Sequence, residues 1–465
     1  MVMPASSAPR WIVTTRDAAL REAAAPELRP LVIRAMADAP AVMVRTSETR
    51  QTIEGFGVCF NELGWTALQR LSSEERRAIL DELFSPAGMG LTVCRMPVGA
   101  NDFSTDWYSY DEEPGDLALE HFSIEHDRAT LVPFIREALA RQSELRLWAS
   151  PWSPPSWMKR NGHYAAALPL PDSGVENGLA PDQVGVEGTD LFRVDEPAYL
   201  DAYARYFGRF VDAYAAEGIR IGAVMPQNEF NSPQVFPSCT WTSEGLARFV
   251  AVLGPVMAAR GVEVFLGTQE RADPDQTLRV LADPEAARWI VGAGFQWAGK
   301  GAIAAIHREA PRLRLYQTEQ ECGDGRNDWR FARYAWTLLR HFLTSGANAY
   351  VYWNLALDEG GVSRWGWAQN SLVVVDPASG TARYTHEYAL LKHVSGFVRP
   401  GAVRLEAFSW SGYENQLAFR NPDGEIVVVV QNDGADELPY SVAIDDRRFD
   451  VVLPADSFST FVVPA

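Results

Sequence analysis

The chain has few cysteines, few histidines and no long hydrophobic run. Its 465 residues include four cysteines, which are widely spaced and form no CxxC pair (Cys59, Cys94, Cys239 and Cys322). This spacing excludes a disulfide scaffold and a standard zinc knuckle, and we expect four buried thiols. The seven histidines include no HExxH motif, so we expect neither a bound metal nor another cofactor.

The sequence also lacks membrane and secretion signals. No run of about 18 apolar residues occurs, so no membrane-spanning helix is expected. The opening residues, MVMPASSAPRWIV, lack the apolar stretch of roughly 7–15 residues found in a signal peptide. The expected location is therefore the cytoplasm, or the exterior if the sequence is that of a processed form.

Positive charge is scarce. Lys and Arg number 42 against 60 Asp and Glu, which gives a formal net charge of −18. A chain this acidic repels a phosphate backbone, so nucleic acid is not an expected partner. The charge instead suits a soluble protein that acts on a neutral ligand.

Apolar and aromatic residues, by contrast, are abundant. The chain is 47% hydrophobic and 11% aromatic, and it contains 15 tryptophans. This composition provides for a large core. So many tryptophans indicate either core packing or a site for a flat ligand such as a sugar.

Eight short apolar runs alternate with helical patterns between residues 55 and 354. Each run is continuously apolar, which is typical of a parallel strand buried on both faces. The runs are Phe56–Phe60, Leu91–Val98, Arg146–Trp152, Gly222–Glu229, Glu263–Gln269, Gly292–Trp297, Arg314–Glu319 and Asn348–Asn354. Eight strand–helix units in series predict an α/β fold, a (β/α)8 TIM barrel, with a doubly wound open sheet as the alternative.

Both ends of the chain have a β-rich pattern. From about Arg399 onward, short β runs alternate with turn signals, and Leu31–Ala35 and Ala41–Arg45 also resemble strands. We therefore expect a catalytic barrel at residues 51–395 and a smaller all-β sandwich side domain at 396–465. The strands of an N-terminal segment, residues 1–50, are expected to join that sandwich.

Carboxylates, carboxamides and tryptophans dominate the carboxyl ends of the predicted strands, where barrel enzymes place their active sites. Two carboxylates facing each other across a barrel mouth suit glycoside hydrolysis: one protonates the leaving oxygen, and the other attacks the anomeric carbon or activates water. Asn and Asp can hold sugar hydroxyls, and Trp can pack against a pyranose. The strand-end residues include Arg95, Asp102, Trp152, Asn228, Glu229, Gln269, Glu270, Gln296, Trp297, Glu319, Trp353 and Asn354.

Six sequence strings carry a family resemblance. They are QTIEGFG from Gln51, RMPV from Arg95, DFS from Asp102, SPWSPPSWMK from Ser150, QNE from Gln227 and WN from Trp353. From about residue 50 to 400 the chain closely resembles glycoside hydrolase family 30, the glucosylceramidase-like retaining β-glycosidases. The β-rich tail suits the side domain of that family.

The resemblance implies specific roles for two carboxylates and their neighbour. Glu229 resembles the general acid/base, and Glu319 resembles the nucleophile. Asn228 is similar to the residue that holds the sugar 2-hydroxyl in this group of barrels. Glu321 is a second carboxylate near Glu319. Because residues i and i+2 point the same way on a strand, geometry alone does not decide which of the two is the nucleophile. The motif favours Glu319.

Further matches concern the substrate-binding wall. Gln296 and Trp297 stand where many family members have His-Tyr, which leaves the substrate detail open. Asn354 is included as a substrate-binding residue because it ends the last barrel strand. Asp102, Trp152 and Trp353 match family positions that line the sugar. Arg95 resembles a residue that supports the nucleophile from the barrel wall.

The implied function is retaining β-glycoside hydrolysis by double displacement, most consistent with an exo-acting, β-glucosidase-like enzyme on β-linked glycosides or oligosaccharides. The alternatives within the family are a β-xylosidase, a β-fucosidase and an endo-β-1,6-glucanase or galactanase. From another class, a non-catalytic carbohydrate-binding barrel is the alternative. Sugar identity, linkage, exo or endo action and oligomeric state depend on contacts that the sequence does not place.

Overall fold

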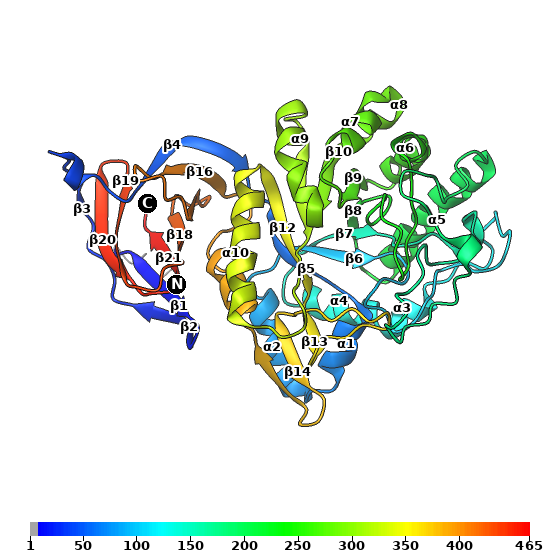
Figure 1. The fold of residues 1–465 in the computed structure, drawn as a ribbon, viewed down its shortest axis with the longest axis horizontal. Helices are drawn as coiled ribbons and strands as arrows, with labels where there is room; N and C mark the ends of the chain where they lie inside the picture. The colour runs from blue at the N-terminus through cyan, green and yellow to red at the C-terminus, as the bar shows by residue number, and fades with distance from the viewer. Residues whose placement is uncertain (1–7) are drawn as a thin grey trace.

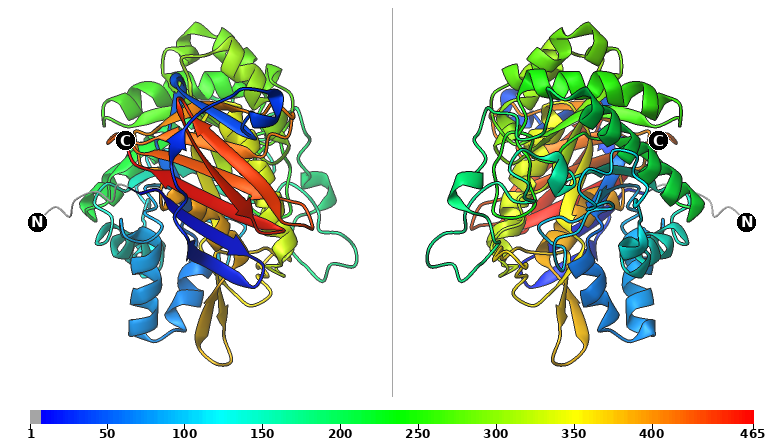
Figure 2. Two further views of the ribbon diagram at one scale, coloured as in Figure 1. Left: turned by 90° about the vertical axis from the view of Figure 1, so that its left-hand side faces the viewer. Right: turned by 90° about the vertical axis from the view of Figure 1, so that its right-hand side faces the viewer.

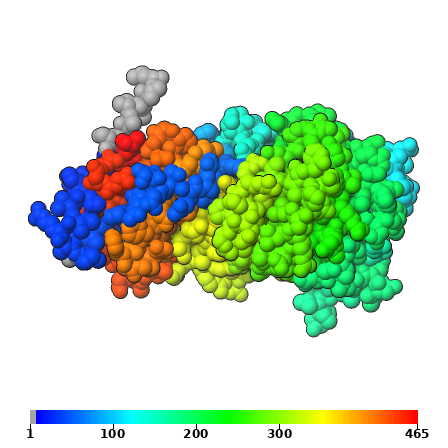
Figure 3. All heavy atoms as spheres, turned by 90° about the horizontal axis from the view of Figure 1, so that it is seen from above, coloured from blue at the N-terminus to red at the C-terminus, as the bar shows by residue number. Residues whose placement is uncertain are grey.

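A computed structural model describes residues 8–465 of the chain. Residues 1–7, the start of the predicted N-terminal segment and of the stretch searched for a signal peptide, lie outside the described residues. The molecule is elongated and has two parts side by side (Figures 1 and 3). One part is a barrel surrounded by helices, and the other is a β-rich unit that contains both ends of the chain.

Eight parallel strands form a closed barrel in the order β10-β11-β12-β5-β6-β7-β8-β9. This closure confirms the predicted (β/α)8 barrel and excludes the open sheet. A buried cluster that includes Trp148, Phe265 and Tyr316 packs on these strands. The strands are β5 (Gly55–Cys59), β6 (Val93–Pro97), β7 (Arg146–Ser150), β8 (Ile221–Val224), β9 (Glu263–Gln269), β10 (Ile290–Gln296), β11 (Arg314–Glu319) and β12 (Ala347–Asn354).

Amphipathic helices surround the barrel. Side-chain caps begin several of them; the Thr242 hydroxyl, for example, accepts a hydrogen bond from the backbone of Gly245. The helices are α1 (Glu62–Gln69), α2 (Ser73–Phe84), α3 (Glu125–Ala129), α4 (Leu131–Leu139), α5 (Pro197–Ala216), α6 (Ser243–Ala258), α7 (Asp275–Ala282), α8 (Pro284–Ala287), α9 (Ile303–Glu309), α10 (Trp329–Thr344) and α11 (His386–Ser395). No helix within residues 8–465 is long and apolar enough to cross a membrane.

Short elements complete the barrel part. A three-stranded sheet follows β12 in the chain and pairs in the order β13-β14-β15. The 3-10 turns include η4, which directly follows β10 at the mouth of the barrel. These elements are β13 (Ala356–Asp358), β14 (Val373–Asp376), β15 (Thr381–Tyr384), η2 (Ser156–Met158), η3 (Pro181–Gln183) and η4 (Trp297–Gly301), whereas the 3-10 turn η1 (Met36–Asp38) lies in the N-terminal segment.

The β-rich part is built from both ends of the chain. Its strands pair in the order β2-β1-β21-β18-β17-β16-β4-β19-β20-β3, so early and late strands lie side by side (Figure 2). The strands are β1 (Arg10–Thr15), β2 (Ala18–Ala23), β3 (Arg29–Pro30), β4 (Val42–Thr52), β16 (Val403–Phe408), β17 (Gln416–Arg420), β18 (Ile426–Asn432), β19 (Leu438–Ile444), β20 (Arg447–Leu453) and β21 (Ser457–Val463).

One predicted strand of this part is wrong. The run Leu31–Ala35 is irregular, and only Arg29–Pro30 before it pairs, as β3. The partner strand β20 begins at Arg447, which lies opposite Pro30. No strand therefore remains beside residues 31–35 to accept and donate the ladder hydrogen bonds.

Strand β18 links the two parts because its side chains alternate between two cores. Val428 and Val430 pack in the interior of the β-rich part. Val427 and Val429 point the other way and join the large core of the barrel part. The β-rich part is thus attached to the barrel through a shared apolar layer.

Candidate active site

A cavity of about 420 Å³ lies at the carboxyl ends of the barrel strands. Its wall comes from residues that follow different strands, as expected for a barrel enzyme. Six of the ten predicted site residues line it: Asp102, Trp152, Asn228, Glu229, Trp297 and Glu319. The other four, Arg95, Gln296, Trp353 and Asn354, are fully buried around it.

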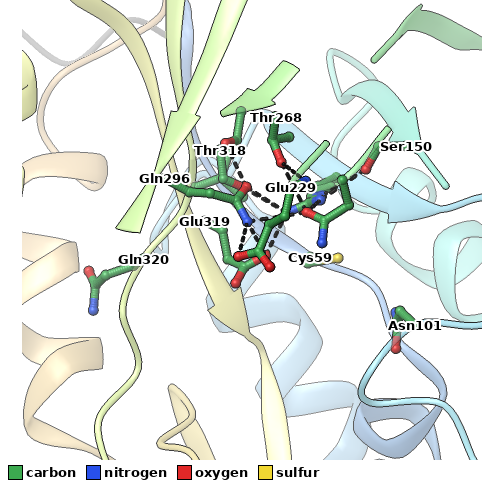
Figure 4. A network of polar contacts seen from close by, with 12 residues as sticks. Cys59, Asn101, Ser150, Glu229, Thr268, Gln296, Thr318, Glu319 and Gln320 are labelled. Carbon is green, nitrogen blue, oxygen red and sulfur yellow. Dashed lines mark hydrogen bonds and ion pairs between the residues drawn. The ribbon is translucent and has the colours of Figure 1, made fainter. Parts of the chain in front are cut away.

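Glu229 and Glu319 share one hydrogen-bond donor. The side-chain nitrogen Nε2 of Gln296 lies 3.3 Å from Glu229 Oε1 and 3.1 Å from Glu319 Oε2 (Figure 4). These two oxygens can therefore be separated by no more than the sum of the two distances, about 6.4 Å. Retaining glycosidases hold their carboxyl groups about 5–5.5 Å apart, and inverting enzymes about 6.5–9.5 Å apart. The upper limit for these two oxygens lies between the two ranges, just below the inverting one.

Two further donors hold the carboxylate of Glu319. Arg95 Nη1 lies 2.8 Å from Oε2, and the indole Nε1 of Trp297 lies 3.0 Å from Oε1. Both oxygens therefore accept hydrogen bonds from groups that are fixed at the barrel wall. Donors to a charged carboxylate favour its ionised form.

Arg95 is central to the site although it does not line the cavity. Its side chain is 0% exposed. Besides Glu319, the guanidinium donates to Asn228 Oδ1 at 2.6 Å and to Ser150 Oγ at 2.9 Å. The ring of Trp152 lies 4.2 Å from its central carbon, and Trp353 lies 5.4 Å away. A buried arginine with these partners fixes the residues around it in one arrangement.

Asn228 presents its amide group to the cavity. Its Oδ1 already accepts hydrogen bonds from Arg95, from Thr268 Oγ1 at 3.0 Å and from Gln296 Nε2 at 3.1 Å. Within residues 8–465, no acceptor pairs with its Nδ2. The NH2 group is thus oriented as a donor toward whatever occupies the cavity.

The surroundings of Glu229 and Glu319 shift the pKa values of the two carboxyl groups to different extents. Burial raises the pKa of Glu229 well above its usual range, and the charges of Glu270 and Glu319 raise it further. Burial also raises the pKa of Glu319, but Arg95, Trp297 and Gln296 oppose that rise. The arrangement favours a protonated Glu229 beside an ionised Glu319, the pairing that acid-assisted nucleophilic attack requires.

Asp102 offers an unused acceptor. Its side chain is buried, and Oδ1 has no hydrogen-bond partner among the described residues. Burial and the nearby Glu319 raise the pKa of this carboxyl. Because unsatisfied buried acceptors are costly, a sugar hydroxyl in the cavity would be a favourable partner.

Two predicted substrate contacts need revision. Asn354 is fully buried, and its amide pairs at both ends with protein: Oδ1 accepts from Asn61, and Nδ2 donates to Gln369, each at 3.0 Å. Gln296 is also fully buried and uses its Nε2 on the two carboxylates. Both residues position cavity residues and do not reach the cavity surface themselves.

The structure gives Glu321 partners that differ from those of Glu229 and Glu319. Glu321 Oε1 pairs with Lys300 Nζ at 2.6 Å, and Oε2 accepts from the Tyr334 hydroxyl at 2.7 Å. Glu321 lies beyond the end of β11, which ends at Glu319. The alternation of side chains along a strand therefore does not place Glu321 on the same side as Glu319.

Other cavity residues were not selected from the sequence. Glu270 stood among the strand-end residues but was not chosen, although its position carried the same signal as Glu229. Gln234, Phe236, Trp367 and Gln369 come from loops, where no periodic pattern marks them. The segment 160–196, between β7 and β8, contributes no side chain to the cavity lining.

Comparison with known proteins agrees with this geometry. The family model described as the glycosyl hydrolase family 30 TIM-barrel domain matches residues 53–398. The chain belongs to glycosyl hydrolase family 30. The family 30 beta sandwich domain matches residues 401–461. The predicted family and enzyme class are thus confirmed, and this family 30 chain has both parts in the expected order.

Its relatives include enzymes with different names. The family 30 chain is 28% identical to the lysosomal acid glucosylceramidase of Mus musculus, over 89% of this chain and 81% of that protein. It is 26% identical to an endo-1,6-beta-D-glucanase of Neurospora crassa, over 90% of this chain and 87% of that protein. The crystal structure of SrfJ from Salmonella typhimurium superposes with a TM-score of 0.87 at 25% identity, covering 98% and 99% of the two chains.

Proposed function

We propose that this family 30 protein hydrolyses β-linked glycosides with retention of configuration. The observation that carries the proposal is the shared donor of Gln296, which keeps Glu229 and Glu319 within one hydrogen bond of the same atom. Two buried carboxylates at this spacing suit double displacement.

In the first step, Glu319 acts as nucleophile. Its carboxylate oxygen forms a bond to the anomeric carbon while the bond from that carbon to the leaving oxygen breaks. Glu229, held protonated by its surroundings, gives its proton to the departing oxygen. In the second step, Glu229 takes a proton from water as the water oxygen attacks the anomeric carbon, which releases Glu319.

The remaining polar groups suit a sugar in the cavity. The free amide of Asn228 can donate to the 2-hydroxyl, and Asp102 can accept from a second hydroxyl. Trp152 provides an apolar surface beside them. The substrate class that fits best is a β-glucoside-like glycoside cleaved from its end. Endo-β-1,6-glucanase activity is the second candidate, because the Neurospora crassa relative carries that name.

The stereochemistry of azide rescue tests the assignment of the two carboxylates. Glu319→Ala should abolish turnover of a 4-nitrophenyl β-glycoside, and added azide should restore it to give the α-glycosyl azide. Glu229→Ala should accumulate a glycosyl-enzyme and give the β-glycosyl azide. Glu321→Ala serves as the matched control and should retain turnover without azide. Substantial azide-independent turnover by Glu319→Ala would contradict the proposal.

A substrate panel tests the activity itself. Wild-type protein should release 4-nitrophenol from at least one member of a set of β-glucoside, β-xyloside, β-fucoside and β-galactoside substrates. Release of long oligosaccharides from a β-1,6-glucan, with no release from the aryl panel, would favour the endo-glucanase. Binding of sugars with no hydrolysis of any member or polymer would favour the non-catalytic barrel.

A further inference from the structure

Glu270 is a carboxylate in the cavity wall, besides Asp102, Glu229 and Glu319, that the proposed chemistry does not use. It directly follows β9, is buried and lines the cavity. Its Oε1 forms an ion pair with Arg271 Nη1 at 2.9 Å. Neither of its oxygens accepts a hydrogen bond from the described residues. Because buried carboxylate oxygens normally accept hydrogen bonds, this group is suited to a partner that enters the cavity.

Glu270 lies close to Glu229, the proposed acid: the backbone N–H of Glu229 donates to Thr268 Oγ1 at 2.9 Å, two residues before Glu270, and both glutamates line the cavity. The charge of Glu270 also raises the pKa of Glu229, and a group beside the acid can contact the leaving group whose oxygen that acid protonates. The η4 turn packs directly against Glu270: a Cβ on Gly299 would lie 2.1 Å from the carbonyl oxygen of Gln269 and 3.4 Å from Glu270 Cα. The backbone thus holds Glu270 at a fixed place beside the acid.

Other polar side chains line the cavity together with Glu270, beside the aromatic rings of Phe236, Trp297 and Trp367. Gln234 Nε2 donates to Ser232 Oγ at 2.7 Å, and both residues line the cavity. Arg271 also pairs with Glu187 at 3.0 Å, outside the cavity lining. A hydrocarbon chain against Glu270 would leave its two oxygens without hydrogen bonds, which is unfavourable. A hydroxylated group could satisfy them.

We propose that Glu270 accepts hydrogen bonds from hydroxyl groups of the leaving group, so that the preferred leaving group is a second sugar and not an alkyl or lipid chain. This inference rests on the proposed hydrolase function. It assigns Glu270 a role in substrate specificity on the leaving-group side, while Asp102 and Asn228 act on the sugar that is cleaved. Loss of a hydrogen bond to a charged group reduces transition-state binding about tenfold to 100-fold.

The test compares leaving groups on one sugar. Wild-type protein is assayed on 4-nitrophenyl β-glucoside, octyl β-glucoside and a panel of β-1,3-, β-1,4- and β-1,6-linked glucobioses. We expect kcat/KM for the best glucobiose to exceed that for octyl glucoside. Glu270→Ala should lower kcat/KM about tenfold or more for that glucobiose and much less for the aryl glucoside. Glu270→Gln, which keeps one acceptor oxygen, should lose less.

Glu187→Gln is the matched control, since it changes the other acidic partner of Arg271 outside the cavity. It should leave the ratio of the two kcat/KM values unchanged. An equal loss on both substrates in Glu270→Ala, a changed ratio in Glu187→Gln, or a wild-type preference for octyl glucoside would overturn the inference. Such results would leave the hydrolase function intact. Only a lack of hydrolysis of every glycoside would contradict that function.

Discussion

Arg95 Nη1 lies 2.8 Å from Glu319 Oε2, and both side chains are almost completely buried. A buried ion pair of this kind is strongly destabilised when one partner is removed, because the other charge remains without compensation. Here the guanidinium also holds Asn228 and Ser150. Arg95 therefore connects the proposed nucleophile to the proposed 2-hydroxyl contact.

Replacing Arg95 by lysine tests this connection. Arg95→Lys should lower kcat on an aryl β-glycoside by about 100-fold or more and lower the melting temperature, because one ammonium group cannot replace the planar set of donors. Arg70→Lys is the control, since Arg70 forms an exposed pair with Asp358 at 3.0 Å. It should stay near wild type. Equal kcat values for wild type and Arg95→Lys would refute the positioning role.

Trp297→Phe tests the second donor to Glu319. The substitution keeps an aromatic ring and removes the Nε1 donor, so the charged form of Glu319 becomes less favourable. The acidic limb of the pH profile of kcat/KM should move to higher pH, with kcat reduced about tenfold. Trp410→Phe changes an exposed tryptophan on the β-rich part and should leave the limb in place. An unmoved acidic limb in Trp297→Phe would show that the indole hydrogen bond is not used.

The pKa of Glu229 should depend on its charged neighbours. Glu270, Glu319 and Asp102 raise it, and the hydrogen bond from Gln296 lowers it. In Glu319→Gln one negative charge is removed, so Glu229 should titrate at lower pH than in the wild type. Titration of carbon-13-labelled glutamate by NMR measures this shift. Glu321→Gln removes a charge that pairs with Lys300 and should leave the titration unchanged; a higher pKa of Glu229 in Glu319→Gln would contradict the expectation.

Stability should respond to pH through a carboxyl outside the cavity. Burial raises the pKa of Glu387 to about 8 in the folded protein. The folded state therefore binds this proton more tightly than the unfolded state does, and the resulting stabilisation is complete below the ordinary pKa of glutamate. That contribution is lost as pH rises from about 4.5 toward 8, at about 1.4 kcal/mol for each pKa unit.

Glu387→Gln should therefore lose less stability than the wild type between pH 5 and 9. Chemical unfolding at several pH values measures the difference. At pH 5 the variant should be the less stable protein, because Asn370 and Gln320 both donate to the native carboxyl. Parallel stability curves for the two proteins would rule out the titration of Glu387 in this range.

The barrel could be predicted because its eight strands are continuous apolar runs between helical patterns. Glu263–Gln269 and Arg314–Glu319 were predicted with the observed bounds. The run Leu31–Ala35 failed because strand formation requires a partner, and β20 ends its pairing at Pro30. Local sequence does not report where a distant partner strand begins.

The candidate site, like the fold, could be predicted only in part from the sequence. Residues at strand ends were found because the barrel brings those ends together. The sequence could not separate a side chain that faces the cavity from one that pairs behind it, as Asn354 does with Asn61 and Gln369. Gln234 and Trp367 lie on loops, whose paths depend on tertiary packing that no periodicity records.

The pairing of β1 with β21 also bears on how the chain folds. Trp11 lies opposite Phe461 in this ladder, and its indole nitrogen donates to Ser459 at 3.0 Å. During synthesis, β1 can pair with β2 early, but its other partner, β21, is made near the end of translation. Most barrel strands pair with the next strand along the chain, apart from β12, which closes the barrel on β5; the β1–β21 pair spans a still longer stretch of sequence. We expect the completion of the β-rich sheet to be the late, slow event of folding. Until then, the edge of β1 that pairs with β21 is exposed to wrong partners.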